Sequence, residues 1–215
     1  KVIWSVPQKN LWNSGTLTTA GNLVFQGRAD GNLVAYQAET GKILWEFNTG
    51  LGISAPPITY SINGRQYIAL LVGWGGGYSG TSGSETGWGY GVHMRRLIAF
   101  SLEGTVELPK LPPPFFPVPL LGPDFILDDE LAIKGAREYG ACRFCHGPAV
   151  VAGGMAPDLR ASPIALEKAT FDAVLRGVAK VSMGMPAFPD MTDEQLLALM
   201  HYIRQQARSS AQLNR

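Results

Sequence analysis

Ala141-Cys142-Arg143-Phe144-Cys145-His146-Gly147 is the stretch that decides the fold of the second half of this chain. It contains both cysteines of the protein, two residues apart, and a histidine directly after the second. C-x-x-C-H is the attachment signature of a c-type haem, in which the two thiols add across the vinyl groups and the histidine becomes an iron ligand. We therefore predict that Cys142 and Cys145 hold haem c covalently and that His146 is one axial ligand.

Three other uses of the motif compete with haem. A thioredoxin-like dithiol follows a strand in a βαβ unit, and no such pattern surrounds residues 141–147. A zinc site needs two further Cys or His ligands at close spacing, and none is near. A plain structural disulfide gives His146 no role. Haem is the interpretation that uses all three side chains.

A haem held in this way often takes methionine as its sixth ligand. Residues 181–189, Val-Ser-Met-Gly-Met-Pro-Ala-Phe-Pro, form a turn-rich loop between two helical stretches. We predict Met185 as the ligand, because Pro186 stiffens the loop that must hold the sulfur. Met183 is the rival. Three further methionines fit packing roles better: Met155, Met191 and Met200.

The segment from Asp124 to the C-terminus resembles a class I cytochrome c domain, which is all-α. Leu131, Gly135 and Tyr139 fall on one face of its first helix. A second apolar face, with Tyr202, falls on the last helix, which we expect from Glu194 to about Ala207. In the family these helices cross closely, and Gly135 would let Tyr202 approach.

Sequence signals also mark the starts of these helices. Asp128-Asp129-Glu130 puts acids at the start of the first helix, and residues 192–195, Thr-Asp-Glu-Gln, form a capping box for the last. Ser162-Pro163 is predicted to start a helix between them that ends near Gly177. His201 is expected to be a surface residue of the last helix.

Residues 1–107 are predicted to be all-β. The runs 2–6, 23–26, 33–36 and 43–47 are predicted strands, with a hairpin turn at Asp30-Gly31. Trp4 and Trp45 lie 41 residues apart in similar runs. A repeat of about 40 to 45 residues made of four short strands indicates a propeller blade.

A second blade follows, with strands at 57–60, 66–72 and 96–101 and an insertion, rich in glycine and aromatic residues, at 73–94. Two blades cannot close a ring, because such architectures need about three or more units to bury a continuous core. Haem c is also assembled outside the cytoplasm, yet no export signal opens the chain. We therefore expect the chain to be the C-terminal part of a longer exported protein.

The charge and hydropathy of the sequence limit the classes of function to consider. The formal net charge is only +1, with 8 basic and 6 acidic residues before Pro123 and 10 and 11 after it. Neither part has the basic excess of a nucleic-acid-binding surface. No apolar run approaches the length of a transmembrane helix, so no transmembrane segment is predicted.

The β-rich half resembles a specific family. Residues 11–27, together with Asp30-Gly31, Thr40-Gly41-Lys42 and Trp45, are similar to the late blades of pyrroloquinoline quinone (PQQ)-dependent alcohol dehydrogenases. Joined to a cytochrome, the pattern resembles the quinohaemoprotein alcohol dehydrogenases. The implied fold is the C-terminal blades of an eight-bladed quinoprotein propeller joined to a cytochrome c domain. One departure is Gln37, where the docking motif usually has an acid or asparagine.

This resemblance implies the cofactors and their contacts. PQQ would lie at the propeller axis, and Trp12 and Asn13 correspond to one of its contacts; a packed tryptophan and a turn asparagine are the alternative. The catalytic base and the ligands of Ca²⁺ would lie upstream, so no catalytic residue is expected in this chain, and the chain alone is expected to be inactive.

Residues 108–123, between the propeller part at 1–107 and the cytochrome at 124–215, are predicted to be a linker. Their proline density favours extended polyproline II. Apolar residues between the prolines, such as Phe115 and Leu120, suggest a strap lying on the protein surface.

The expected function belongs to the whole, periplasmic protein. It would oxidise a small alcohol to the aldehyde with PQQ and pass electrons through haem c to an external acceptor, which is a copper protein, another cytochrome c or a membrane quinone. The alternative is an electron carrier, a cytochrome c fused to a non-catalytic β domain.

Overall fold

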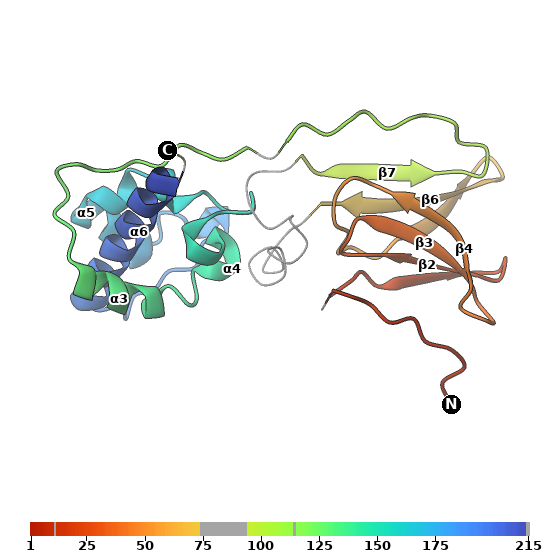
Figure 1. The fold of residues 1–215 in the computed structure, drawn as a ribbon, viewed down its shortest axis with the longest axis horizontal. Coiled ribbons are helices and arrows are strands. Elements are labelled where there is room, and N and C mark those ends of the chain that lie inside the picture. The colour runs from red at the N-terminus through yellow and green to blue at the C-terminus, as the bar shows by residue number, and fades with distance from the viewer. Residues whose placement is uncertain (11, 74–93, 114, 214–215) are drawn as a thin grey trace. The chain divides into compact units, whose positions relative to one another are not determined.

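The computed structural model of the chain describes residues 1–10, 12–73, 94–113 and 115–213. The chain divides into two compact units, Lys1–Phe115 and Phe116–Arg215. The first carries the strands and the second the helices (Figure 1). Their boundary falls inside residues 108–123, which we keep as the proposed linker between domains at 1–107 and 124–215. The predicted insertion and His93 lie outside the described residues, apart from the two ends of the insertion.

The first unit contains two antiparallel sheets of consecutive strands. One has four strands in the order β1-β2-β3-β4, and the other has three, β5-β6-β7, among the residues described. Their bounds are Thr16–Thr19 (β1), Leu23–Gly27 (β2), Asn32–Gln37 (β3), Ile43–Asn48 (β4), Ile58–Ile62 (β5), Arg65–Val72 (β6) and Arg96–Phe100 (β7). Three strands of this meander, β2, β3 and β4, match the predicted blade, whereas β1 was not predicted. Its β2–β3 turn places Gly31 at a φ of 92°, a backbone conformation that favours glycine.

Ring contacts follow the predicted 41-residue repeat. The Trp4 ring lies 6.1 Å from Tyr36 of β3, and the Trp45 ring lies 5.6 Å from Phe100 of β7. Tyr36 and Phe100 occupy matching positions in the third strands of the two sheets. A Cβ built on Gly41 would lie 2.5 Å from the Trp4 ring, so this turn must carry glycine to receive the indole. The tryptophans thus link successive repeats.

The predicted strand at residues 2–6 is wrong. These residues form no strand, and Val2 and Ile3 are 79% and 74% exposed. An alternating pattern stabilises a strand only where a neighbouring edge accepts its hydrogen bonds. Trp4 is nevertheless fixed, because its indole N–H donates to the carbonyl of Ala38 at 2.8 Å.

Buried aliphatic side chains of both sheets and of the segment between them form one core in the first unit. Its members are Leu33, Leu51, Ile53, Leu70, Val72 and Ile98. Other large apolar side chains of the second sheet are exposed, including Ile58, Leu71 and Leu97. The apolar flank expected of an unpaired blade is therefore present.

The second unit is helical and has a single main core. Its α-helices are α3 (Asp129–Glu138), α4 (Arg143–His146), α5 (Lys168–Leu175) and α6 (Asp193–Leu213), with short 3-10 turns η1 (Pro148–Val150), η2 (Leu159–Ala161), η3 (Ile164–Leu166) and η4 (Val181–Met183). Helix α6 extends past its expected end at Ala207. Among the described residues no helix is both long and apolar enough to span a membrane.

Helices α3 and α6 pack closely at Gly135. A Cβ added there would lie 2.0 Å from the carbonyl oxygen of Ala198 and 2.7 Å from the Cβ of Tyr202. The rings of Tyr139 and Tyr202 lie 5.3 Å apart, one turn beyond. This confirms the expectation that Gly135 admits Tyr202.

The predicted helix starts are correct at both ends of the domain. Asp128 caps α3 by accepting a hydrogen bond from the backbone of Leu131. Thr192 and Gln195 bond each other reciprocally at the start of α6, at 2.9 and 3.2 Å, as a capping box does. His201 of α6 is part of the first cap, because its Nδ1 accepts from the backbone N–H of Asp128 at 2.9 Å.

The predicted start of the middle helix is wrong. Ser162 and Pro163 precede the short turn η3, and α5 is capped by Glu167 instead. The carboxylate of Glu167 accepts from the backbone N–H groups of Ala169 and Thr170 at 2.9 and 2.6 Å. A longer acidic side chain can reach the same donors that a serine would, and local sequence does not distinguish the two starts.

Both ends of the proposed linker are attached, each to its own unit. Leu108 and Leu111 pack against the core of the first unit, and the Arg96 guanidinium donates to the carbonyl of Pro109. In the second unit, residues 120–125 are held by two arginines of α6. These observations fit the expected strap.

The two arginines form a clasp, which we name the Arg204–Arg208 clasp. Arg204 is fully buried and donates to the carbonyl of Leu120. Arg208 donates to three backbone carbonyls between residues 121 and 125, at 2.6 to 3.0 Å. The backbone N–H of Leu120 donates in turn to the carbonyl of Arg160 at 2.9 Å. Arginine suits this position because its fork satisfies several acceptors at once.

Candidate functional site

The C-x-x-C-H motif forms the short helix α4 and its cap. Cys142 is the N-cap, and its carbonyl accepts from the backbone N–H of His146 at 2.9 Å. Gly147 ends the helix at a φ of 79°, where an added Cβ would lie 1.8 Å from the carbonyl oxygen of Val151. Glycine is therefore required at position 147, where the chain turns sharply after α4.

Both thiols are free and half-buried, and the motif lies in a helical unit without strands among its described residues. This excludes the βαβ setting of a thioredoxin-like dithiol. The described residues also contain no group of three or more His, Cys, Asp or Glu side chains placed to hold a metal. Burial raises the pKa of the Cys142 thiol. The two sulfurs are thus unpaired thiols, the form that thioether bonds require.

The imidazole of His146 is buried and held in one orientation. Only 8% of the residue is exposed, and its Nδ1 lies 2.8 Å from the carbonyl oxygen of Pro157. Because a carbonyl only accepts, Nδ1 carries the proton and Nε2 keeps its lone pair. Burial lowers the pKa of His146, although the bond to Pro157 and the charge of Asp158 act in the opposite direction. A neutral histidine with a fixed tautomer is prepared for metal ligation.

A second buried hydrogen bond braces the same turn. The hydroxyl of Tyr139, at the end of α3, donates to the carbonyl of Gly147 at 2.9 Å. Burial raises the pKa of Tyr139 far above its usual value, so the hydroxyl stays a donor. Neither Tyr139 nor Pro157 was assigned to the site from the sequence, because their roles depend on contacts across eight and eleven residues.

The two candidate methionines differ in environment. Met185 is half-buried and packs against the core of the second unit, as does Cys142. Met183 is 76% exposed, and its sulfur lies 3.8 Å from the amine of Lys180. Of the other methionines, Met200 is buried in that core, Met191 packs against it and Met155 is 47% exposed.

Trp12 and Asn13 precede β1 in the first unit. The Trp12 residue is 42% exposed. Both ends of the Asn13 amide are bonded to backbone: Oδ1 accepts from Ala29 N–H at 2.9 Å, and Nδ2 donates to Asn10 at 3.3 Å. Asn13 therefore fixes the segment that carries Trp12.

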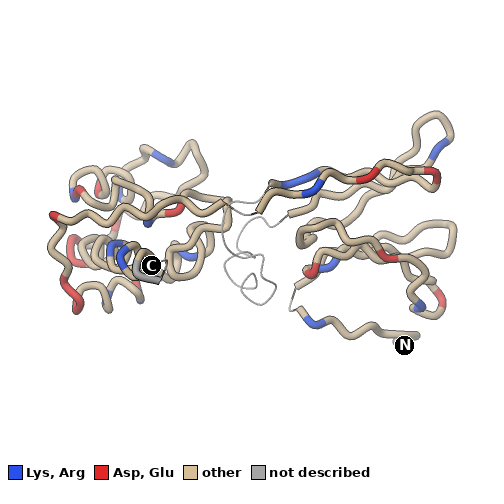
Figure 2. The backbone as a smooth tube through the Cα atoms, turned by 45° about the horizontal axis from the view of Figure 1, so that its top comes forward, with Lys and Arg blue, Asp and Glu red and all other residues tan. Residues whose placement is uncertain are grey.

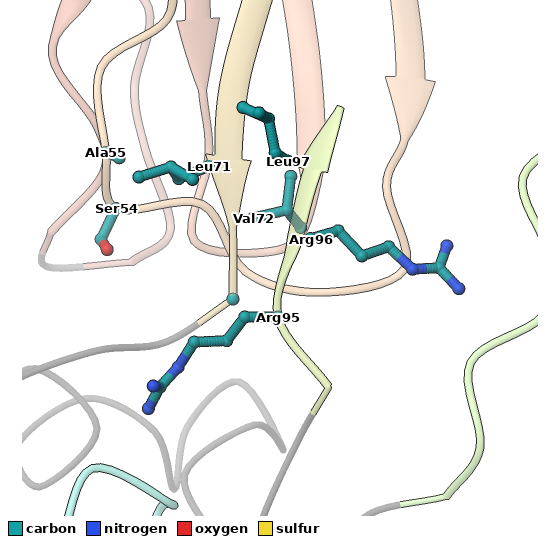
Figure 3. Close-up of a pocket in the computed structure, with 8 residues that line it drawn as sticks. Ser54, Ala55, Leu71, Val72, Arg95, Arg96 and Leu97 are labelled. Atoms are coloured by element: carbon teal, nitrogen blue, oxygen red, sulfur yellow. The ribbon is translucent and has the colours of Figure 1, made fainter. Parts of the chain in front are cut away.

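The first unit also has a hollow of about 410 Å³ at the end of β6 and the start of β7. Figure 3 shows Ser54 and Ala55 on the loop beside it, and Arg95 and Arg96 extending in different directions. Trp12 and Asn13 do not line this hollow. Along the described backbone, Lys and Arg are distributed over both units together with Asp and Glu (Figure 2).

Two family profiles match the two units. The profile "Glucose/ethanol/alcohol dehydrogenase, beta-propeller domain", a PQQ family, matches residues 4–68. The profile "Cytochrome C oxidase, cbb3-type, subunit III" matches residues 132–203 and so covers the C-x-x-C-H motif. Fold and site together define a quinoprotein-type propeller segment joined to a c-type cytochrome domain.

Individual proteins give a more specific match. The chain is 40% identical over 191 residues, 88% of its length, to a quinohemoprotein alcohol dehydrogenase, ADH IIB, of Pseudomonas putida. It is 39% identical over 99% of its length to the dehydrogenase subunit of an alcohol dehydrogenase (quinone) of Acetobacter aceti. It spans only 28% and 29% of these relatives.

Solved structures agree with these relatives. The quinohemoprotein alcohol dehydrogenase ADHIIG of Pseudomonas putida HK5 aligns with 99% of the chain, with a TM-score of 0.72 and 37% identity, over 31% of its own length. The enzyme of Comamonas testosteroni aligns with 96%, with a TM-score of 0.61 and 34% identity, over 30% of its own length. The chain is thus similar in sequence and fold to the C-terminal region of quinohaemoprotein alcohol dehydrogenases. The predicted fold class is confirmed.

Proposed function

We propose that the whole protein is a periplasmic, PQQ-dependent alcohol dehydrogenase in which this chain provides part of the quinone site and the electron exit. The observation that carries the proposal is a buried, single-tautomer His146 beside two free thiols, in a chain whose β-rich half matches a dehydrogenase propeller. That match favours a dehydrogenase over the electron carrier with a non-catalytic β domain.

Cys142 and Cys145 would form the thioethers to haem c, and the Nε2 of His146 would ligate its iron. When bound, PQQ supplies the two-electron acceptor for the alcohol and the haem supplies a one-electron exit. The protein sets the geometry: the carbonyl of Pro157 holds the histidine ring, and the residue is buried. The electrons leave to an external copper protein, cytochrome c or membrane quinone.

In the propeller part, Trp12 and Asn13 contribute to the PQQ site. The exposed indole of Trp12 offers flat apolar area and an N–H donor to a planar quinone. The amide of Asn13 holds this segment in place through its backbone bonds. The catalytic base and the ligands of Ca²⁺ belong to the upstream region of the relatives, which this chain does not cover.

An optical titration of the whole protein tests this function. The protein is exported with haem, reconstituted with PQQ and Ca²⁺, and given a primary alcohol without any other reductant. We expect the haem α band to rise only when PQQ and alcohol are both present. If dithionite reduces the haem but alcohol does not, even in the presence of PQQ, the result would support the electron carrier instead.

Met185 is our choice for the sixth iron ligand, since its side chain faces the same core as Cys142 while that of Met183 is largely in solvent. We expect Met185→Ala to abolish the methionine-to-iron charge-transfer band and to lower the haem potential, because thioether ligation favours the ferrous state. Met183→Ala is the matched control and should leave both unchanged. The reverse pattern would assign the ligand to Met183.

A further inference from the structure

A buried ion pair lies directly after the residue that holds His146. The guanidinium of Arg160 bonds the Asp158 carboxylate with two parallel hydrogen bonds, at 3.0 and 2.7 Å. The two side chains are only 8% and 2% exposed. Burying two charges costs several kcal/mol per ion before their attraction offsets it, so such a pair is weak evidence for stability alone. Stability alone therefore does not explain the Asp158–Arg160 pair.

Asp158 also fixes the backbone on both sides of itself. Its Oδ1 accepts from the backbone N–H of Arg160 at 3.0 Å and caps η2, and its Oδ2 accepts from that of Ala152 at 3.4 Å. The peptide that these bonds immobilise begins with the carbonyl of Pro157, which receives the Nδ1 proton of His146 at 2.8 Å. The carboxylate thus determines where the acceptor of the histidine proton lies.

The charge of the Asp158 carboxylate also lies near the His146 imidazole. Asp158 follows directly on Pro157, whose carbonyl oxygen lies 2.8 Å from the Nδ1 of His146, so its charge lies close to the imidazole. On the far side, the carbonyl of Arg160 accepts from Leu120, so the proposed linker meets the same loop. The pair therefore connects the histidine to the attached strap.

We propose that Asp158 and Arg160 are positioning residues for the haem, holding the Pro157 carbonyl against His146 and keeping the charge beside the iron ligand neutral. This rests on the proposed haem c site. Its consequence is electrostatic. Oxidised haem carries one more positive charge than reduced haem, so an unpaired cation nearby favours the reduced form and an unpaired anion favours the oxidised form.

The test is the midpoint potential of the haem in the whole, haem-loaded protein. Asp158→Asn leaves the Arg160 cation unpaired and weakens the grip on Pro157, and both effects raise the potential. Arg160→Gln leaves the Asp158 anion unpaired, while its bond to Ala152 and its cap on η2 remain, so the potential falls. The double variant restores neutrality and is expected between the two.

Asp172→Asn is the matched control, because it removes the same charge from a partly exposed pair with Arg176. We expect its potential to equal that of the wild type. Shifts of opposite sign in the two single variants are the signature, since general structural damage has no reason to change sign. Variants that lose stability but keep the wild-type potential, or shift it in the same direction, would overturn the proposal.

Two further outcomes are distinguishable. If Asp158→Asn does not fold, the midpoint potential of Arg160→Gln alone tests the proposal. A lower potential in that variant supports it, and an unchanged potential contradicts it. If the wild-type chain carries no covalent haem, as read by haem staining of a denaturing gel, the proposed haem c site itself has failed and this inference with it.

Discussion

Replacing Cys142 and Cys145 together by alanine removes all covalently bound haem from the chain. Both thiols are free and half-buried on one short helix, and they are the only cysteines in the sequence. No other residue can form a thioether to the vinyl groups. The readout is haem staining after denaturing electrophoresis, with the chain expressed alongside an export and haem-attachment system.

The single variants are the controls. Cys142→Ala and Cys145→Ala each leave one thioether, so each keeps a weaker haem stain and a pyridine haemochrome band shifted to longer wavelength, as one unreacted vinyl group demands. In the whole protein, the double variant should also lose the alcohol-driven rise of the haem α band. A double variant that still carries haem through denaturation would refute the covalent assignment.

Gly135→Ala lowers the free energy of unfolding of the cytochrome unit by roughly 3 kcal/mol, the upper end of what overpacking usually costs. The added methyl would lie 2.0 Å from the carbonyl oxygen of Ala198, which is a backbone atom of α6 and cannot move aside. Helices α3 and α6 must separate to admit it, and their contact is the largest in the unit. Denaturant unfolding of the haem-loaded chain, followed by far-UV circular dichroism, measures the loss.

Gly140→Ala is the matched control. Its Cβ would meet only the carbonyl oxygen of Arg137, at 3.3 Å, just beyond the end of α3. The cost there should stay below about 1 kcal/mol. Equal losses in the two variants would mean that glycine matters through backbone freedom rather than through the helix crossing.

Local sequence predicted the parts of the fold whose causes are local. The hairpin at Asp30-Gly31 and the capping box of Thr192 and Gln195 involve residues a few positions apart, and the structure contains both. The crossing at Gly135 was predictable because a family resemblance supplied the partner helix. The supposed strand at 2–6 failed because its alternating pattern says nothing about whether a neighbouring edge is present.

The parts of the site that were missed depend on distant contacts. Nothing near Pro157 in sequence indicates that its carbonyl receives the proton of His146, eleven residues earlier. Asp158 and Arg160 resemble ordinary surface charges until the structure shows them buried together. The Arg204–Arg208 clasp spans more than eighty residues. The motif predicts the haem-binding residues, and only the fold shows which residues support them.

The attachment of the linker at both ends affects kinetics as well as structure. Leu108 and Leu111 pack on the core of one unit, and residues 120–125 are held by the other, so the two anchors are close together in sequence. A short tether keeps its cargo at an effective concentration on the order of 1 mM, whatever the dilution of the protein. If the proposed function is correct, electron delivery to the haem of the same chain should therefore be first-order. A soluble competitor cytochrome at micromolar concentration could not intercept it.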